Sequence, residues 1–188
     1  MSSEFEEKGY TKVSNFLDED TVKTMSSYMK NTVNRGLCDS ESDSCVVCSY
    51  KTYADPLVEI LLENLLPEVE RVVDKDLYPT YSFFRVYVKG DALHKHTDRP
   101  SCEYSVSVNI ANDGGNWPIY MQRGEEEPSR IVLNPGDAVI YKGCEVNHWR
   151  STAESTNATA QFMLHYVDKN GPFSDYKFDQ RASLGLRR

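Results

Sequence analysis

The chain has 188 residues, of which 39% are hydrophobic and 27% charged, a composition typical of a folded protein with one sizeable core. Its formal net charge is −8, and its only basic cluster is the short C-terminal stretch RASLGLRR, so we expect no nucleic-acid partner. No apolar run approaches the roughly 18–20 residues that cross a membrane, and the acidic start lacks the pattern of a signal peptide. We therefore expect a cytoplasmic protein without a membrane partner, forming one domain over residues 1–188.

Helical patterns dominate the region before residue 75. The stretch YTKVSNFL is typical of a short strand, and an amphipathic helix follows it with Asp18 as its N-cap. After a polar, acidic loop, a second helix is expected to begin at Asp55 and Pro56, a cap followed by a proline in the first turn. Pro67 should kink or divide this helix. The helical part is thus expected over about residues 15–75.

After Tyr78 the hydrophobic pattern changes to a period of two, which predicts β-strands. YSFFRVYV alternates Tyr81, Phe83, Arg85 and Tyr87 against Ser82, Phe84, Val86 and Val88, and YSVSVNIA alternates Val106, Val108 and Ile110 against Ser105, Ser107 and Asn109. Further strands are expected at 117–121, 131–133, 138–141, 146–150 and 160–167. The order predicts an α+β, mainly β fold: a double-stranded β-helix (jelly roll) over about 78–168, with the N-terminal helices packed outside and a tail at 169–188.

The stretch LHKHTDRPSCEYS contains two of the four histidines in the chain. Residues two apart on an extended segment point the same way, so His96 and Asp98 can face one point. His148 lies 52 residues after His96, on a strand that a jelly roll can bring alongside. Two histidines and one carboxylate on one side of a metal leave the opposite positions open, which is typical of non-haem Fe(II) oxygenases.

Together with the turn and strand NPGDAVIY, these residues resemble the Fe(II)- and 2-oxoglutarate-dependent dioxygenases of the prolyl-4-hydroxylase-like branch. VSNFLDEDTV is similar to the helical segment of that branch, and FRVYVKGD to the strand and turn before its first histidine, with Tyr87 at the usual tyrosine. The resemblance covers about residues 10–168. It implies Fe(II) held by His96, Asp98 and His148 as catalytic centre, with 2-oxoglutarate and O₂ as cosubstrates. It also implies hydroxylation of a C–H bond while 2-oxoglutarate is converted to succinate, since the carboxylate that halide-transferring relatives lack is present here as Asp98.

Two alternatives stay open. A cupin-like metalloenzyme without 2-oxoglutarate would use His94, His96, His148 and a glutamate, but the nearest one, Glu103, lies farther along the chain than the cupin pattern places it. The second alternative is a binding domain that has the jelly-roll fold but no catalytic activity.

The resembling branch holds the far carboxylate of 2-oxoglutarate with a basic residue on the last strand. Here that strand, within STNATAQFMLHYV, has no Arg or Lys. A buried carboxylate needs a charged partner, so another residue must serve. Arg150 shares the inward face with His148, and Arg85 shares a face with Tyr87 on the strand next to the last one. Arg150 is slightly favoured as the anchor. Arg150, Arg85 and Tyr87 are all candidate residues for binding 2-oxoglutarate.

Candidate substrate-binding residues are Arg99 at the pocket mouth, Asn109 on a polar strand face and Trp117 as a wall. Peptidyl proline and small molecules both fit as substrates, and no pattern specifies an oligomeric state. Cys38, Cys45 and Cys48 are interpreted as loop thiols in preference to a zinc or redox site, because no second cysteine pair is present. His165 is expected on the last strand, as a core residue or a residue that supports a metal ligand, in preference to a ligand itself.

Overall fold

The computed structural model describes residues 2–40, 45–46, 49–111 and 117–186. Its helices are α1 (Ser2–Lys8), α2 (Glu19–Asn34), α3 (Pro56–Asn64) and α4 (Leu66–Val73), with short 3₁₀ segments η1 (Pro100–Cys102) and η2 (Ser174–Gln180). Its strands are β1 (Tyr10–Val13), β2 (Tyr50–Tyr53), β3 (Leu77–Tyr87), β4 (Leu93–His96), β5 (Tyr104–Ala111), β6 (Ile119–Arg123), β7 (Ser129–Ile131), β8 (Ala138–Lys142), β9 (Val146–Arg150) and β10 (Thr159–Asp168).

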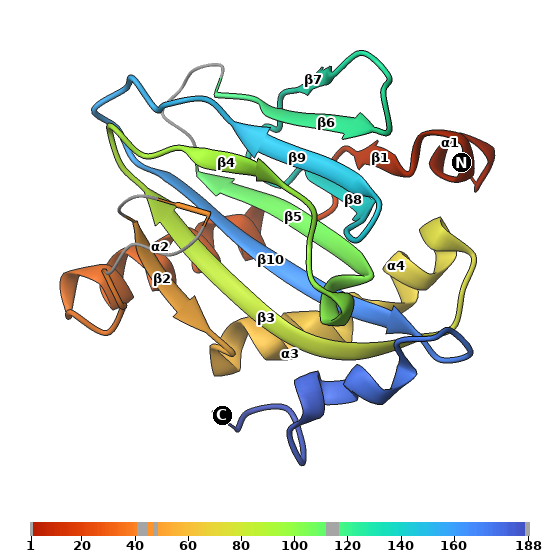
Figure 1. Cartoon of the computed structure of the whole chain (residues 1–188). Coiled ribbons are helices and arrows are strands. Elements are labelled where there is room, and N and C mark those ends of the chain that lie inside the picture. The colour runs from red at the N-terminus through yellow and green to blue at the C-terminus, as the bar shows by residue number, and fades with distance from the viewer. Residues whose placement is uncertain (1, 41–44, 47–48, 112–116, 187–188) are drawn as a thin grey trace.

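The strands form two antiparallel sheets that lie against each other (Figure 1). The larger sheet has the order β1-β8-β5-β10-β3-β2, and the smaller one has the order β4-β9-β6-β7. The last long strand, β10, lies between β5 and β3. This mainly β architecture with a few helices is a double-stranded β-helix, so the predicted fold class is confirmed.

The period-two patterns divide the larger sheet into an apolar face and a mixed face, as predicted. The apolar face packs on the helices, and its fully buried members include Phe84, Val106, Val108, Phe162 and Leu164. The opposite face looks toward the smaller sheet and carries the polar side chains that lie between them in sequence, among them Arg85, Ser105, Ser107, Gln161 and His165. The face away from the helices is therefore the one that can build a site.

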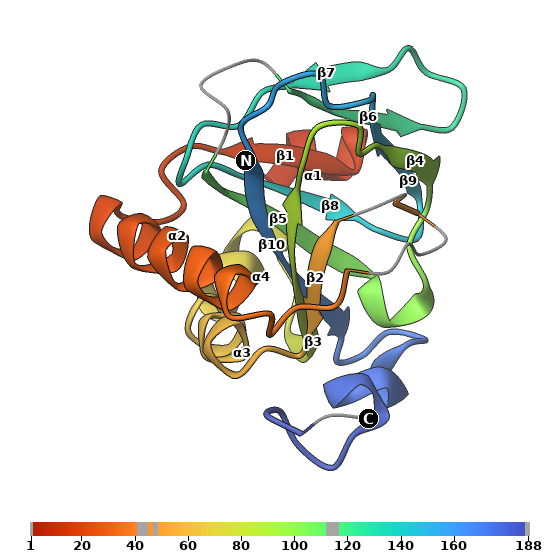
Figure 2. The ribbon, with the colours of Figure 1, turned by 90° about the vertical axis from the view of Figure 1, so that its left-hand side faces the viewer.

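Two helices begin where the sequence predicts, whereas α1 lies before the part expected to be helical. Asp18 caps α2 by accepting a hydrogen bond from the Thr21 N–H at 2.7 Å, and Asp55 caps α3. Pro67 divides the second helix into α3 and α4, because proline is tolerated only in the first turn of α4. Helices α2, α3 and α4 lie together on the outer side of the larger sheet (Figure 2). None of the described helices has the length and apolar character needed to span a bilayer.

Two further segments differ from the sequence-based expectation. The strand β2, within the part expected to be helical, pairs with β3 at the sheet edge. The C-terminal segment, expected to be a tail, is tied to the body by two ion pairs: Arg99 with Asp179, and Arg181 with Glu59 at 2.6 Å. Asp179, Arg181 and Glu59 are nearly fully buried at their charged ends. Local pattern does not encode these contacts, because each depends on a partner far away in the sequence.

Candidate metal centre and pocket

Two histidines and an aspartate meet where β4 pairs with β9. His96 lies directly opposite His148 in the antiparallel register, and their ring centroids are 4.2 Å apart. Asp98 follows β4 directly, and its Oδ1 is 3.7 Å from Nε2 of His96 and 3.5 Å from Nε2 of His148. These separations are too long for hydrogen bonds. The three ligand atoms all lie within 4.8 Å of one another, so one ion can be shared among them.

The hydrogen bonds of the two imidazole rings engage Nδ1 and so leave Nε2 of each ring to bind a metal. Nδ1 of His96 donates to the carbonyl of His94 at 2.7 Å, and Nδ1 of His148 donates to the carbonyl of Val146 at 3.1 Å. Because Nδ1 carries the proton in each ring, Nε2 carries a lone pair on the side of Asp98. Burial also lowers the pKa of His148, which favours the neutral ring that a metal requires.

Asp98 is oriented by contacts on its other side. The hydroxyl of Ser105 donates to Oδ2 of Asp98 at 2.8 Å, which leaves Oδ1 for the histidine side. The backbone N–H of Asp98 donates to the carbonyl of Gly143 at 2.8 Å. This close approach needs glycine, because a Cβ at Gly143 would collide with the carbonyl oxygen of Cys102 and lie 2.6 Å from Oδ2 of Asp98. The donor set, its protonation and its support thus fit an Fe(II) ion.

We expect Gly143→Ala to lower metal affinity about 10- to 100-fold, the range typical when residues that support metal ligands are changed. The added methyl group must displace the Asp98 carboxylate or the neighbouring backbone. Calorimetric titration of Co(II) into each protein measures the effect. Gly171→Ala is a matched control, because its Cβ would also be crowded, 2.9 Å from Cβ of Asp168, but its close neighbours Asp168 and Glu103 are not members of the triad. Wild-type affinity in Gly143→Ala would contradict this account of Asp98.

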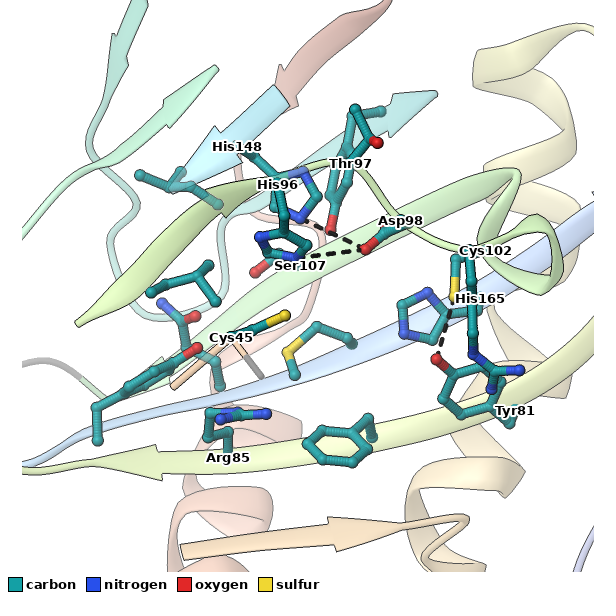
Figure 3. Close-up of a pocket in the computed structure, with 18 residues that line it drawn as sticks. Cys45, Tyr81, Arg85, His96, Thr97, Asp98, Cys102, Ser107, His148 and His165 are labelled. Carbon is teal, nitrogen blue, oxygen red and sulfur yellow. Dashed lines mark hydrogen bonds and ion pairs between the residues drawn. The ribbon is translucent and has the colours of Figure 1, made fainter. Parts of the chain in front are cut away.

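A pocket of about 450 Å³ opens beside the triad, between the two sheets (Figure 3). The triad lies on the smaller-sheet side, and the polar face of the larger sheet lies opposite. Arg85 lines one end of the pocket, while Tyr81 and His165 line the other. Apolar side chains also line the pocket, among them Phe83, Leu93, Ile119 and Met163.

The Arg85 end combines a cation with amide and aromatic groups. Arg85 is only 6% exposed, and it lies on β3 directly opposite Gln161 of β10, which also lines the pocket. Its Nη1 donates to Oγ of Ser49 at 3.2 Å, and its guanidinium carbon lies 5.1 Å from the ring centre of Phe83. Tyr87, two residues farther along β3, lines the same end. Gln161 therefore stands on the last strand where a basic anchor was expected, with Arg85 as its neighbour across the sheet.

Arg150 points between the sheets but does not line the pocket. It is 3% exposed, and its Nη1 donates to the carbonyl of Trp117 at 2.7 Å, while its guanidinium carbon lies 4.9 Å from the Trp117 ring centre. Its Nε and Nη2 have no hydrogen-bond partner among the described residues. Burial lowers the pKa of Arg150 to about 10. The sequence slightly favoured Arg150 as the cosubstrate anchor. The geometry gives more support to Arg85, because Arg85 lines the pocket and Arg150 does not.

The three residues expected to bind substrate have different surroundings. Arg99 lines the pocket, but it forms a two-bond ion pair with Asp179 at 2.9 and 3.0 Å. Asn109 does not line the pocket, and its side-chain amide donates a hydrogen bond to the carbonyl of Leu133. Trp117 also lies outside the lining, with its indole N–H bonded to the carbonyl of Ser151. The substrate-binding roles of Asn109 and Trp117 stay predictions, although neither residue lines the pocket.

The structure places His165 next to the residue that holds Asp98, one of its two expected roles, but sequence reasoning missed that it also lines the pocket. It lines the pocket, and its Nδ1 lies 2.9 Å from Oγ of Ser105, the residue that holds Asp98. Burial lowers the pKa of His165 to about 4. Its position two residues after Met163 and four after Gln161 on one strand face was the available signal.

We expect the stability of the metal-free protein to fall as pH drops from about 6.5 to about 4, partly because of His165. The unfolded ring binds a proton below its ordinary pKa of 6.5, whereas the folded ring does so only near 4. The unfolded state is therefore favoured in that window, with a slope of up to about 1.4 kcal/mol per pH unit for one proton. Urea unfolding of wild type and His165→Gln across this range measures the contribution. The exposed His94→Gln variant should keep the wild-type slope; an unchanged slope in His165→Gln would contradict the assignment.

The alternative ligand set does not assemble. The side chain of His94 is exposed, and Glu103 accepts a hydrogen bond from the N–H of Asp168. Neither belongs to a potential metal cluster among the described residues. Cys45 lines the pocket, Cys38 lies in a separate depression near Tyr28, and Cys48 lies outside the described residues. The described part of the chain thus offers no zinc site built from Cys38 and Cys45.

Comparison with solved structures identifies the architecture. A prolyl-4-hydroxylase from Pseudomonas putida superposes with a TM-score of 0.71 at 12% identity, covering 89% of this chain and 96% of that one. A prolyl hydroxylase from Trichoplax adhaerens, in complex with a peptide fragment of hypoxia inducible factor, gives 0.73 at 12% identity, with 89% and 87% covered. HygX from Streptomyces hygroscopicus, with nickel and 2-oxoglutarate bound, gives 0.70 at 13% identity, with 89% and 86% covered.

The chain has the fold of the Fe(II)/2-oxoglutarate oxygenases. This oxygenase fold accounts for the two sheets, the outer helices and the position of the pocket between the sheets. No protein-family model and no curated protein matches the sequence itself.

Proposed function

We propose that this protein is an Fe(II)- and 2-oxoglutarate-dependent oxygenase that hydroxylates a C–H bond of a peptide or small-molecule substrate. The observation that carries the proposal is the His96–Asp98–His148 group, whose ligand atoms lie within 4.8 Å of one another at the side of a pocket. A facial set of two histidines and one carboxylate leaves positions open for 2-oxoglutarate and O₂. The oxygenase fold of the chain supports the same class.

In this proposal the residues of the protein bind the metal, orient the metal ligands and exclude water from the pocket. His96 and His148 offer Nε2, and Asp98 offers Oδ1, while backbone carbonyls and Ser105 fix their directions. Bound iron and 2-oxoglutarate supply O₂ activation, with 2-oxoglutarate decarboxylated to succinate. The retained carboxylate of Asp98 favours hydroxylation, because it occupies the position that a halide would need.

Arg85 is proposed to hold the far carboxylate of 2-oxoglutarate. Its guanidinium lines the pocket, and the amide of Gln161 lies directly across the sheet as a second donor. Tyr87 lines the same end. A guanidinium in a nearly dry site pairs well with a carboxylate, and the apolar lining strengthens that pairing by excluding water. The absence of a basic residue on β10 is then compensated by its neighbour on β3.

Proteins with the same fold have been solved with both kinds of molecule bound. One was solved with a peptide fragment, and HygX was solved with hygromycin B. The pocket of this chain, about 450 Å³ in volume, is large enough for 2-oxoglutarate and part of a substrate.

Anaerobic addition of Fe(II) and then 2-oxoglutarate tests the proposal. We expect a weak visible charge-transfer band at about 500 nm, typical of 2-oxoglutarate chelated to Fe(II) at such a site. Bound iron without the band would favour a metalloenzyme that does not use 2-oxoglutarate. A protein that binds no iron would rule out both enzymes and leave a binding domain.

A further inference from the structure

The end of the pocket opposite Arg85 has a distinct chemical character. His165, Tyr81 and Cys102 line it (Figure 3), and the guanidinium carbon of Arg99 lies 4.6 Å from the Tyr81 ring centre. We call these four residues the His165 wall. Tyr81 precedes Arg85 by four residues on β3, which is about 13 Å along a strand. The wall is therefore separate from the proposed cosubstrate anchor, and none of its members belongs to the proposed metal triad.

The hydrogen bonds behind the wall determine where the proton of His165 lies. Oγ of Ser105 is 2.8 Å from Oδ2 of Asp98 and 2.9 Å from Nδ1 of His165. An ionised carboxylate only accepts, so Ser105 donates its single proton to Asp98. Ser105 must then accept from His165, whose Nδ1 carries the proton. Nε2 of His165 is left with a lone pair and can act only as an acceptor.

His165 keeps this neutral form at ordinary pH. Its side chain is 5% exposed, and burial lowers its pKa to about 4. Among the residues that the structure describes, none donates a hydrogen bond to its Nε2. A buried acceptor that lines a pocket without a donor marks a place where a ligand can supply one.

The remaining members of the wall present no unbalanced charge. Arg99 is paired with Asp179 through two hydrogen bonds, and the fully buried Asp179 also accepts from the hydroxyl of Tyr53 at 2.6 Å. The hydroxyl of Tyr81 contacts Sγ of Cys102 at 3.1 Å, so it is already engaged. The Tyr81 ring lies 4.5 Å from the His165 ring. The wall thus combines aromatic surface with a single acceptor.

We propose that the His165 wall binds a neutral hydrogen-bond donor of the substrate, a hydroxyl or amide N–H on a ring-sized group, through Nε2 of His165. An anionic group would face the lone pair of Nε2, and the cation nearby is already paired with Asp179. The hydrogen bonds then form a series with one direction: the substrate donates to His165, His165 to Ser105, and Ser105 to Asp98. This inference rests on the proposed function, because it treats Asp98, the last acceptor in the series, as a metal ligand.

Matched aromatic probes test the inference in protein loaded with Zn(II) and 2-oxoglutarate. Phenol has the donor, anisole has the same ring without the donor, and benzoate has a charge instead. We expect phenol to bind about tenfold more tightly than anisole, as one good hydrogen bond allows, and benzoate to bind no better than anisole. In His165→Leu, phenol and anisole should bind equally. Tyr166→Phe is the matched control, because it removes a buried hydroxyl from the same strand on the face toward the helices.

Nitrogen-15 NMR of the histidine rings gives a readout independent of affinity. We expect the His165 signals, assigned by their loss in His165→Leu, to show a protonated Nδ1 and a bare Nε2, with Nε2 shifting when phenol is added. Equal binding of phenol and anisole, tightest binding of benzoate, a proton on Nε2, or a phenol preference that survives in His165→Leu would each overturn the inference. Binding of 2-oxoglutarate is measured in the same samples. If it is normal, such results overturn the inference alone; if it is absent, the proposed function fails and the inference with it.

Discussion

Replacing His96 with alanine is expected to reduce metal affinity more than 100-fold, a larger effect than changes to residues that merely support ligands. Nε2 of His96 faces Oδ1 of Asp98 at 3.7 Å, and its ring lies against that of His148. Removing it leaves two ligands, which cannot form the facial set. Titration of Fe(II) or Co(II) under anaerobic conditions measures the change, together with loss of the visible band.

His94→Ala is the matched control for His96→Ala. His94 lies two residues earlier on the same strand, its side chain is exposed, and only its backbone carbonyl supports His96. The substitution retains that carbonyl, so metal affinity should stay within about threefold of wild type, since surface changes usually alter free energies by less than about 0.5 kcal/mol. Equal losses in the two variants would indicate that both histidines bind metal, as the cupin-like alternative requires.

Arg85→Gln is expected to raise the apparent dissociation constant for 2-oxoglutarate about 100-fold while leaving metal affinity nearly unchanged. A paired guanidinium and carboxylate in a buried site lose charge-assisted hydrogen bonds worth about 1.5–3 kcal/mol each. Arg85 lines the pocket, whereas the triad lies on the opposite side of it. Titrating 2-oxoglutarate into Ni(II)-loaded protein separates cosubstrate binding from metal binding.

Arg150→Met provides the comparison for Arg85→Gln. Arg150 is equally buried, but it does not line the pocket, and within the described part of the chain its side chain donates one hydrogen bond, to the carbonyl of Trp117. Methionine fills a similar volume without the charge. We expect 2-oxoglutarate affinity to change less than about fivefold, a difference of roughly 1 kcal/mol. A larger loss in Arg150→Met than in Arg85→Gln would assign the anchor to Arg150 instead.

The elements with local signals were predictable from the sequence. Period-two alternation predicted the faces of β3 and β5, and the caps at Asp18 and Asp55 located the starts of two helices. The fold class followed from the order of helices and strands. The approach of His96, Asp98 and His148 was predicted because i, i+2 geometry is local and the jelly roll brings the later strand alongside.

Features that depend on distant partners were not predictable. The sequence at Tyr50–Tyr53 becomes a strand only because β3 extends far enough to pair with it. Arg99 looked free to bind substrate, but Asp179, 80 residues later, takes both sides of its guanidinium. Asn109 sits on the polar face as predicted, yet a loop carbonyl occupies its amide. The sequence pattern predicts on which face of a strand a side chain lies. Only the packed fold shows which distant residue already bonds to that side chain.

A crystal structure with a divalent metal and 2-oxoglutarate tests the central claim most directly. We predict the metal bound to Nε2 of His96, Oδ1 of Asp98 and Nε2 of His148, with the far carboxylate of 2-oxoglutarate on the guanidinium of Arg85. A metal held by the other nearby cluster, Asp98 with Cys102 and His165, or a 2-oxoglutarate bound away from the metal, would contradict the account.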